Sequence, residues 1–156
     1  MNLPFTKHTL ANGLDVIIHE DHACPIVAVN VWYHVGSKNE RPGHTGFAHL
    51  FEHLMFQGSK HVPADSHFRI LEAAGGTGIN GTTDFDRTNY FETVPSSQLE
   101  LALWIESDRM GYLLESMNAK TVDALMRRLA LALRTDGNRS PGRSVCLRID
   151  SAISAA

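Results

Sequence analysis

Two histidines and a glutamate lie close together at a spacing that suits metal-assisted hydrolysis. In the segment His49-Leu50-Phe51-Glu52-His53, the histidines are four residues apart. On a helix, residues at this spacing lie on the same face one turn from each other, so both imidazoles could bind one zinc ion. Glu52 flanks that face, where a carboxylate can take a proton from zinc-bound water and pass it to a leaving amine. The segment therefore predicts His49 and His53 as metal ligands and Glu52 as a general base.

The same spacing also has a purely structural interpretation. The chain has nine histidines, all of them at or before His67, so a pair four residues apart can arise by chance. Buried helix histidines are also more often hydrogen-bonded core residues than metal ligands. These five residues alone leave both interpretations open.

The residues around the histidine pair predict a helix. Apolar side chains recur at three- and four-residue spacing, at Phe47, Leu50, Phe51, Leu54 and Met55. Thr45 is a candidate N-cap, and the pattern ends near Gly58. The preceding segment, residues 36–46, is polar and rich in glycine and proline, which predicts a loop.

β-Branched and apolar residues predict strands before and after this helix. The expected strands are Phe5–Leu10, Leu14–His19, Ile26–Tyr33, Ile79–Thr83 and Thr88–Val94. Asn12-Gly13 tolerates the positive φ of a tight hairpin turn between the first two strands. Residues 84–86 form the expected turn between the last two.

Three further helices are expected. They are Asp65–Ala74, stopped by Gly75-Gly76; a helix that starts from a Ser97/Glu100 capping box and ends near Gly111; and Thr121–Arg134, ending at Gly137. Residues 138–156 show no clear periodicity. This order of elements predicts an α+β fold in which helices pack on an antiparallel sheet.

Composition is typical of a globular domain with a core. Of the 156 residues, 43% are apolar and 20% are charged. The isolated Cys24 and Cys146 favour neither a disulfide framework nor a thiolate zinc site. The apolar stretch 26–35 is too short for a membrane span, and no signal peptide is recognised, so we expect a cytoplasmic location, or a periplasmic or secreted one if the N-terminus is truncated.

Charge is distributed unevenly along the chain. Residues 1–120 hold 8 basic and 14 acidic side chains, whereas residues 121–156 hold 6 basic and 3 acidic ones. The basic residues after position 120 are arginines scattered without aromatic stacking partners, so nucleic-acid binding is not expected.

The segment Gly43–Ser59, which contains the histidine pair, resembles the pitrilysin/insulinase family of zinc metallopeptidases, the inverzincins. Further segments resemble the same family in the same order: Asn12–Leu14, Val35–Ser37 with Glu40, Asn80–Phe91 and Leu99–Met110. The resemblance covers about residues 5 to 117, which predicts a partial domain of this type.

The resemblance implies a zinc-dependent endopeptidase in which His49 and His53 bind zinc and Glu52 is the catalytic base. Asn80 matches the family asparagine beside the edge strand to which an extended peptide substrate adds, although an ordinary edge or turn amide would look the same. Substrates would be peptides or partly unfolded proteins. The family's working unit has two related domains, so a second domain or subunit is needed.

Several other residues are expected to be structural. Asp84, Asp86 and Arg87 suit turn and ion-pair contacts, and Tyr90 and Trp104 lie inside elements, where aromatic side chains usually pack in the core.

The chain departs from the family pattern at the third zinc ligand. The family glutamate would fall at residues 128–131, Arg-Leu-Ala-Leu here, and both Asp123 and Asp136 lie about two turns away along a helix. We therefore divide the chain into residues 1–120, the N-terminal part of a metallopeptidase domain, and residues 121–156, a divergent helical and irregular tail. We hypothesise that this tail comes from a shifted reading frame or a degraded gene end.

An incomplete ligand set leaves two other functions open. The chain could be a non-catalytic structural or peptide-binding family subunit, although retention of His49, Glu52 and His53 favours the enzyme. A small metal-binding or regulatory module has only the histidine content in its favour.

Overall fold

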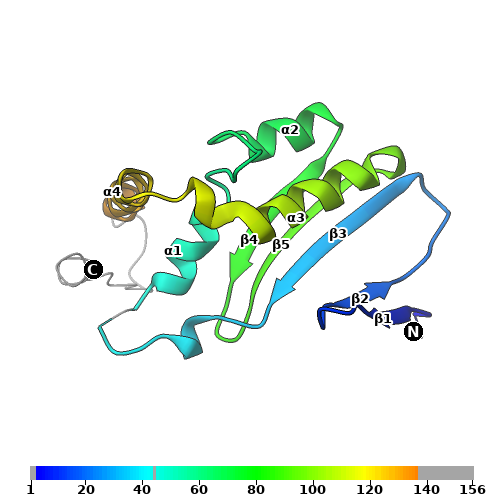
Figure 1. Cartoon of the computed structure of the whole chain (residues 1–156), viewed down its shortest axis with the longest axis horizontal. Coiled ribbons are helices and arrows are strands. Elements are labelled where there is room, and N and C mark those ends of the chain that lie inside the picture. The colour runs from blue at the N-terminus through cyan, green and yellow to red at the C-terminus, as the bar shows by residue number, and fades with distance from the viewer. Residues whose placement is uncertain (1–2, 44, 137–156) are drawn as a thin grey trace.

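The computed structural model describes residues 3–43 and 45–136, with side chains up to residue 127 (Figure 1). In chain order the elements are β1 Thr6–Thr9, β2 Asp15–Ile18, β3 Ile26–Tyr33, η1 Ser37–Asn39, α1 Phe47–Leu54, α2 His67–Ala73, β4 Thr77–Thr83, β5 Thr88–Pro95, η2 Ser96–Gln98, α3 Leu99–Ser116 and α4 Ala119–Asp136. The predicted α+β fold, with helices on an antiparallel sheet, is confirmed. Among these helices, none has the length and apolar character needed to cross a membrane.

The main sheet has three antiparallel strands in the order β3-β5-β4. The central strand β5 pairs with β3 along its whole length, from Ile26 opposite Pro95 to Tyr33 opposite Thr88. On its other side it pairs with β4, where Thr83 also lies opposite Thr88. Within the described residues, β4 is therefore an edge strand with one side unpaired.

The predicted N-terminal hairpin is also present, as a separate two-stranded sheet of β1 and β2. Gly13 has φ +88° at its turn, which explains why glycine follows Asn12 there.

The core lies between the main sheet and its helices. Helix α3 contacts β3 and β5, whereas α1 and α2 contact β4 (Figure 1). The buried apolar residues shared between these layers are Val29, Val62, Leu71, Val94, Ala102 and Ile105. This cluster joins β3 and β5 of the sheet to α2 and α3.

Two of the sequence predictions for α3 are wrong. The expected Ser97/Glu100 capping box is absent, because residues 96–98 form a short 3-10 turn and the helix cap is Gln98 without a side-chain hydrogen bond. The helix also continues past Gly111 to Ser116. Glycine inside a helix costs only about 1 kcal/mol relative to alanine, so tertiary packing of the rest of α3 can outweigh the cost of Gly111.

Of the two aromatic residues predicted to be core, Tyr90 is buried at 1% exposure, but Trp104 is 44% exposed. Ala102 and Ile105 point into the core from the same helix, and Trp104 lies on an adjacent face. The structural prediction for Asp84 and Arg87 is confirmed by their ion pair of 3.2 Å, while that for the exposed Asp86 stays a prediction.

The start of α1 is capped by a residue in the preceding loop, and the prediction of Thr45 as N-cap is wrong. The cap position is Gly46, at φ +93°, and it makes no side-chain cap hydrogen bond. Instead, the two carboxylate oxygens of Glu40 accept hydrogen bonds from the backbone N–H groups of Gly46 and Ala48, each at 2.8 Å. A carboxylate here also interacts favourably with the helix dipole.

A buried ionic cluster lies between α2, α3 and β5. It consists of His67, Glu92, Glu106 and Arg109. Arg109 forms an ion pair with Glu106, and its guanidinium lies 4.1 Å from the centre of the Tyr90 ring. Burial, helped by Arg109, lowers the pKa of His67 to about 3, so this histidine is neutral. Burial raises the pKa of Glu92 to about 8, and the nearby Glu106 carboxylate adds to the rise.

Removal of the Glu40 carboxylate should destabilise the N-terminus of α1. We expect Glu40→Ala to lower the free energy of unfolding by about 1 to 2 kcal/mol, because two helix N–H groups lose their acceptors. Urea unfolding at pH 7 measures the loss, and faster hydrogen exchange at Gly46 and Ala48 locates it. The matched control is Glu72→Ala, which removes an exposed carboxylate from α2 and should change stability by less than about 0.5 kcal/mol.

Stability should fall as pH rises above the ordinary glutamate pKa of 4.5 towards about 8, because Glu92 keeps its proton in the folded state and loses it in the unfolded state. The expected slope is about 1 kcal/mol per pH unit or less. Glu92→Gln should flatten it, whereas Glu100→Gln, at an exposed position, should leave it unchanged. A slope that is the same in all three proteins would contradict the assignment to Glu92.

Candidate metal centre

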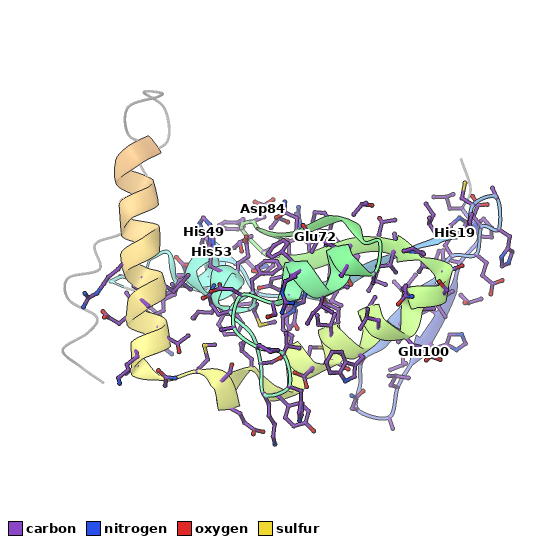
Figure 2. All side chains as sticks on the ribbon, turned by 90° about the horizontal axis from the view of Figure 1, so that it is seen from above. His19, His49, His53, Glu72, Asp84 and Glu100 are labelled. Atoms are coloured by element: carbon purple, nitrogen blue, oxygen red, sulfur yellow. The ribbon has the colours of Figure 1, made fainter. Side chains whose placement is uncertain are left out.

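The two histidines of α1 face the same point in space. Their Nε2 atoms are 3.0 Å apart, and their rings are stacked with centroids 4.8 Å apart. Figure 2 shows both side chains projecting from the same side of the helix. Two ligands of a tetrahedral zinc ion, each about 2.05 Å from the metal, are about 3.3 Å apart. The observed separation is close to this value, so His49 and His53 fit a shared metal ion.

Glu52 completes a group of three side chains that could hold a metal. One ligand atom from each of His49, Glu52 and His53 lies within 4.8 Å of the others. The Glu52 Oε2 atom accepts a hydrogen bond from the hydroxyl of Thr83 on β4. The carboxylate is therefore held next to the imidazoles by a contact between the helix and the sheet.

The charge state of His53 suits metal binding. Burial lowers its pKa, the neighbouring His49 lowers it further, and Glu52 opposes both effects. A neutral imidazole has a lone pair to donate to a metal, whereas an imidazolium has none.

A pocket of about 270 Å³ opens beside these residues. Its lining residues are Glu52, His53, Phe56, Gln57, Asp65, Phe68 and Asn80. The rings of Phe56 and Phe68 are stacked with centroids 4.8 Å apart and give the pocket an aromatic wall. The pocket therefore joins the candidate base, a candidate ligand and apolar surface that could contact a bound molecule.

Asn80 lies on the edge strand β4 and is exposed. Its side-chain Oδ1 accepts a hydrogen bond from the N–H of Gly81 at 2.9 Å. Because Asn80 lines the same pocket as Glu52 and His53, the structure brings together all four residues that the sequence singled out.

The third ligand is not found among the side chains that the structure describes. Helix α4, where the family resemblance places it, does contact α1. Asp123 on this helix forms an ion pair with Arg127 at 2.8 Å and is not part of the candidate metal group. The side chains of residues 128–131 and Asp136 lie outside the described residues, as does the tail from residue 137.

Two residues that support the site were not predicted as such from the sequence. Glu40 appeared only as part of a family motif, and Thr83 only as the end of a strand and within the family-like segment Asn80–Phe91. Glu40 bonds Ala48 across a loop of irregular structure, and Thr83 bonds Glu52, which is 31 residues away, so neither helix spacing nor strand propensity identifies these partners.

Comparison with known proteins places this chain in a family. The family model "Insulinase (Peptidase family M16)" matches residues 15–130. A relative named zinc protease PqqE, from Helicobacter pylori, is 35% identical over 125 residues, which are 80% of this chain and 27% of that protein. The chain thus spans about a quarter of the length of this curated relative.

Solved structures show the same likeness. A protease from Helicobacter pylori superposes with a TM-score of 0.82 at 31% identity, covering 90% of this chain and 33% of the other. The periplasmic protease PqqL from Escherichia coli superposes with a TM-score of 0.74 at 27% identity, covering 83% and 15%. The chain therefore belongs to the insulinase family of peptidases, family M16.

Proposed function

We propose that this chain carries part of the active site of a zinc-dependent endopeptidase, with His49 and His53 as ligands and Glu52 as general base. The main support is the convergence of the two Nε2 atoms, 3.0 Å apart, beside a carboxylate and a pocket. Family membership and the zinc proteases among the relatives support the same activity.

Each residue has a defined part in this mechanism. Zinc, when bound, would polarise a water molecule and lower its pKa. The neutral imidazole of His53, with His49, would hold the metal on the face of α1. Glu52 would accept the proton from that water and deliver it to the amine nitrogen of the broken peptide bond. The water oxygen would bond to the carbonyl carbon as Glu52 takes the proton, and the C–N bond would break as the nitrogen receives that proton, because a neutral amine is a far better leaving group than its anion.

An extended peptide or a partly unfolded protein is the substrate that this site favours. Within the part of the chain that the structure describes, the edge strand β4 has an unpaired side, and its residue Asn80 lines the pocket, so a substrate could add to it as a further strand. Asn80 would then contact the substrate backbone near the bond to be cleaved. The aromatic wall formed by Phe56 and Phe68 could contact a neighbouring apolar side chain of the substrate.

The complete enzyme would be larger than this chain. The chain spans 27% of the PqqE relative, and a second domain or subunit would enclose the site. A third ligand would also be required, because a catalytic zinc site usually has three protein ligands. We propose that the two ligands of this chain bind zinc weakly by themselves. The PqqL relative is described as periplasmic, which favours the periplasmic alternative for compartment.

The second candidate is a non-catalytic family subunit that binds peptides or stabilises an assembly. The absence of a recognisable third ligand at residues 128–131 favours it, and the retained Glu52 disfavours it, because peptide binding alone does not need a base. Zinc-dependent cleavage distinguishes the two, since only the enzyme requires both the metal and Glu52.

Substitution of either histidine should reduce zinc binding. We expect His49→Ala and His53→Ala each to weaken zinc affinity at least about tenfold, because each removes one nitrogen ligand. Competition with a chromophoric chelator measures the affinity, and the exposed His8→Ala variant on β1 is the control. If all three variants bind zinc like the parent chain, the ligand assignment is wrong.

Substitution of Glu52 should lower the rate of peptide cleavage and leave zinc binding nearly unchanged. In Glu52→Gln the carboxylate becomes an amide of nearly the same shape, and cleavage of a quenched fluorogenic peptide should fall by about 10²- to 10⁴-fold because the base is lost. Zinc affinity should change only a few-fold. Equal cleavage by parent and variant would remove Glu52 as base, and a parent chain without zinc-dependent cleavage would favour the non-catalytic subunit.

A further inference from the structure

The candidate base is held by a residue from the sheet. Glu52 is part of α1, but its Oε2 atom accepts a hydrogen bond from the hydroxyl of Thr83, the last residue of β4. We propose that Thr83 is a positioning residue for Glu52, which fixes one carboxylate oxygen so that the other can accept the proton. This inference rests on the proposed function in taking Glu52 as the base.

The direction of the Thr83 side chain is set by the strand. Successive side chains of a strand point to opposite faces. Thr82 accordingly points away from α1, and its hydroxyl donates to Asn89 Oδ1 at 2.5 Å. A shift of one residue in the register of β4 would exchange the two threonines and remove the hydroxyl from Glu52.

The end of β4 is itself firmly anchored. Thr83 lies opposite Thr88 on the central strand, and the buried Thr88 donates its hydroxyl to the carbonyl oxygen of Val35 at 3.0 Å. The loop after Val35 packs against the β4–β5 turn so closely that a Cβ atom on Gly36 would lie 2.4 Å from the carbonyl oxygen of Asp84. The backbone that follows Thr83 is therefore closely packed against the loop after Val35.

A glutamate needs such a second anchor. Its side chain rotates about three bonds, so a fixed helix backbone alone does not place the carboxylate. Thr83 has a single hydroxyl hydrogen, and it is donated to Oε2, which leaves Oε1 as the oxygen available to take a proton. Misplacement of a catalytic group by about 1 Å can cost about 10²-fold in rate, so this one contact can matter for turnover.

Thr83→Val tests the proposal because it keeps the shape and β-branching of the side chain and removes only the hydroxyl. Thr83→Ser restores the hydroxyl, and Thr82→Val is the matched control, since it removes the neighbouring hydroxyl that bonds Asn89 instead. Thr83→Ala is a second hydroxyl-free variant in case valine disturbs packing. Amide NMR spectra of the full chain identify variants that keep the fold.

The first readout needs neither zinc nor activity. Three-bond couplings that report the χ1 angle of Glu52, and the ¹³C shift of its carboxyl, are measured in the full chain, with Glu52→Gln assigning the signals. The parent, Thr83→Ser and Thr82→Val should show one rotamer and the same carboxyl shift. Thr83→Val or Thr83→Ala should show averaged couplings and a displaced shift. Unchanged couplings and shift in a folded hydroxyl-free variant would overturn the proposal.

The second readout is cleavage of the fluorogenic peptide with zinc present. Thr83→Val should lower kcat about 10- to 100-fold with KM within about twofold of the parent value, and Thr83→Ser should recover most of the loss. An unchanged kcat in Thr83→Val would overturn the proposal while leaving the peptidase function intact. If the parent chain cleaves no peptide, the proposed function fails for this chain, and the NMR result still decides whether Thr83 positions Glu52.

Discussion

The geometry of the site depends on how the loop before α1 holds the start of this helix and contacts the sheet. At the N-terminal end, the carboxylate of Glu40 accepts hydrogen bonds from helix N–H groups that have no partner inside the helix. The same loop contacts the β4–β5 turn, where the N–H of Ser37 donates to Asp84 and that of Lys38 donates to Phe85. These contacts hold the start of α1 in place and so help to set the positions of the two imidazoles that the helix carries.

Local patterns in the sequence predicted the elements and the three central site residues. The apolar spacing of α1 and the four-residue spacing of His49 and His53 both follow from helix geometry, which is a local property. The hairpin at Gly13 followed from turn chemistry in the same way. Two contacts could not be predicted because they depend on tertiary structure: Glu40 caps α1 across an irregular loop, and Thr83 on the sheet bonds Glu52. Trp104 was mispredicted because position inside a helix does not tell which face meets the sheet.

The buried ionic cluster lies directly behind the aromatic wall of the pocket. Phe56 lines the pocket and also contacts the rings of His67 and Tyr90. Arg109 lies over both Phe56 and Tyr90, with the guanidinium 5.2 Å from the centre of the Phe56 ring. A guanidinium over the face of an aromatic ring is attracted electrostatically by that ring. Phe56 therefore contacts both the pocket and the buried cluster, and it links the two.

The open side of β4 has a consequence for the isolated chain. An unpaired strand edge presents a row of amide and carbonyl groups that any other extended chain can use, including another molecule of the same protein. Natural edge strands discourage this with lysine, proline, inward charges or β-bulges. The β4 sequence Thr-Gly-Ile-Asn-Gly-Thr-Thr has no charge and no proline, and its one such device is the irregular register between Thr77 and Asn80. The backbone groups that the proposed substrate would use are the same groups through which two copies of the chain can associate.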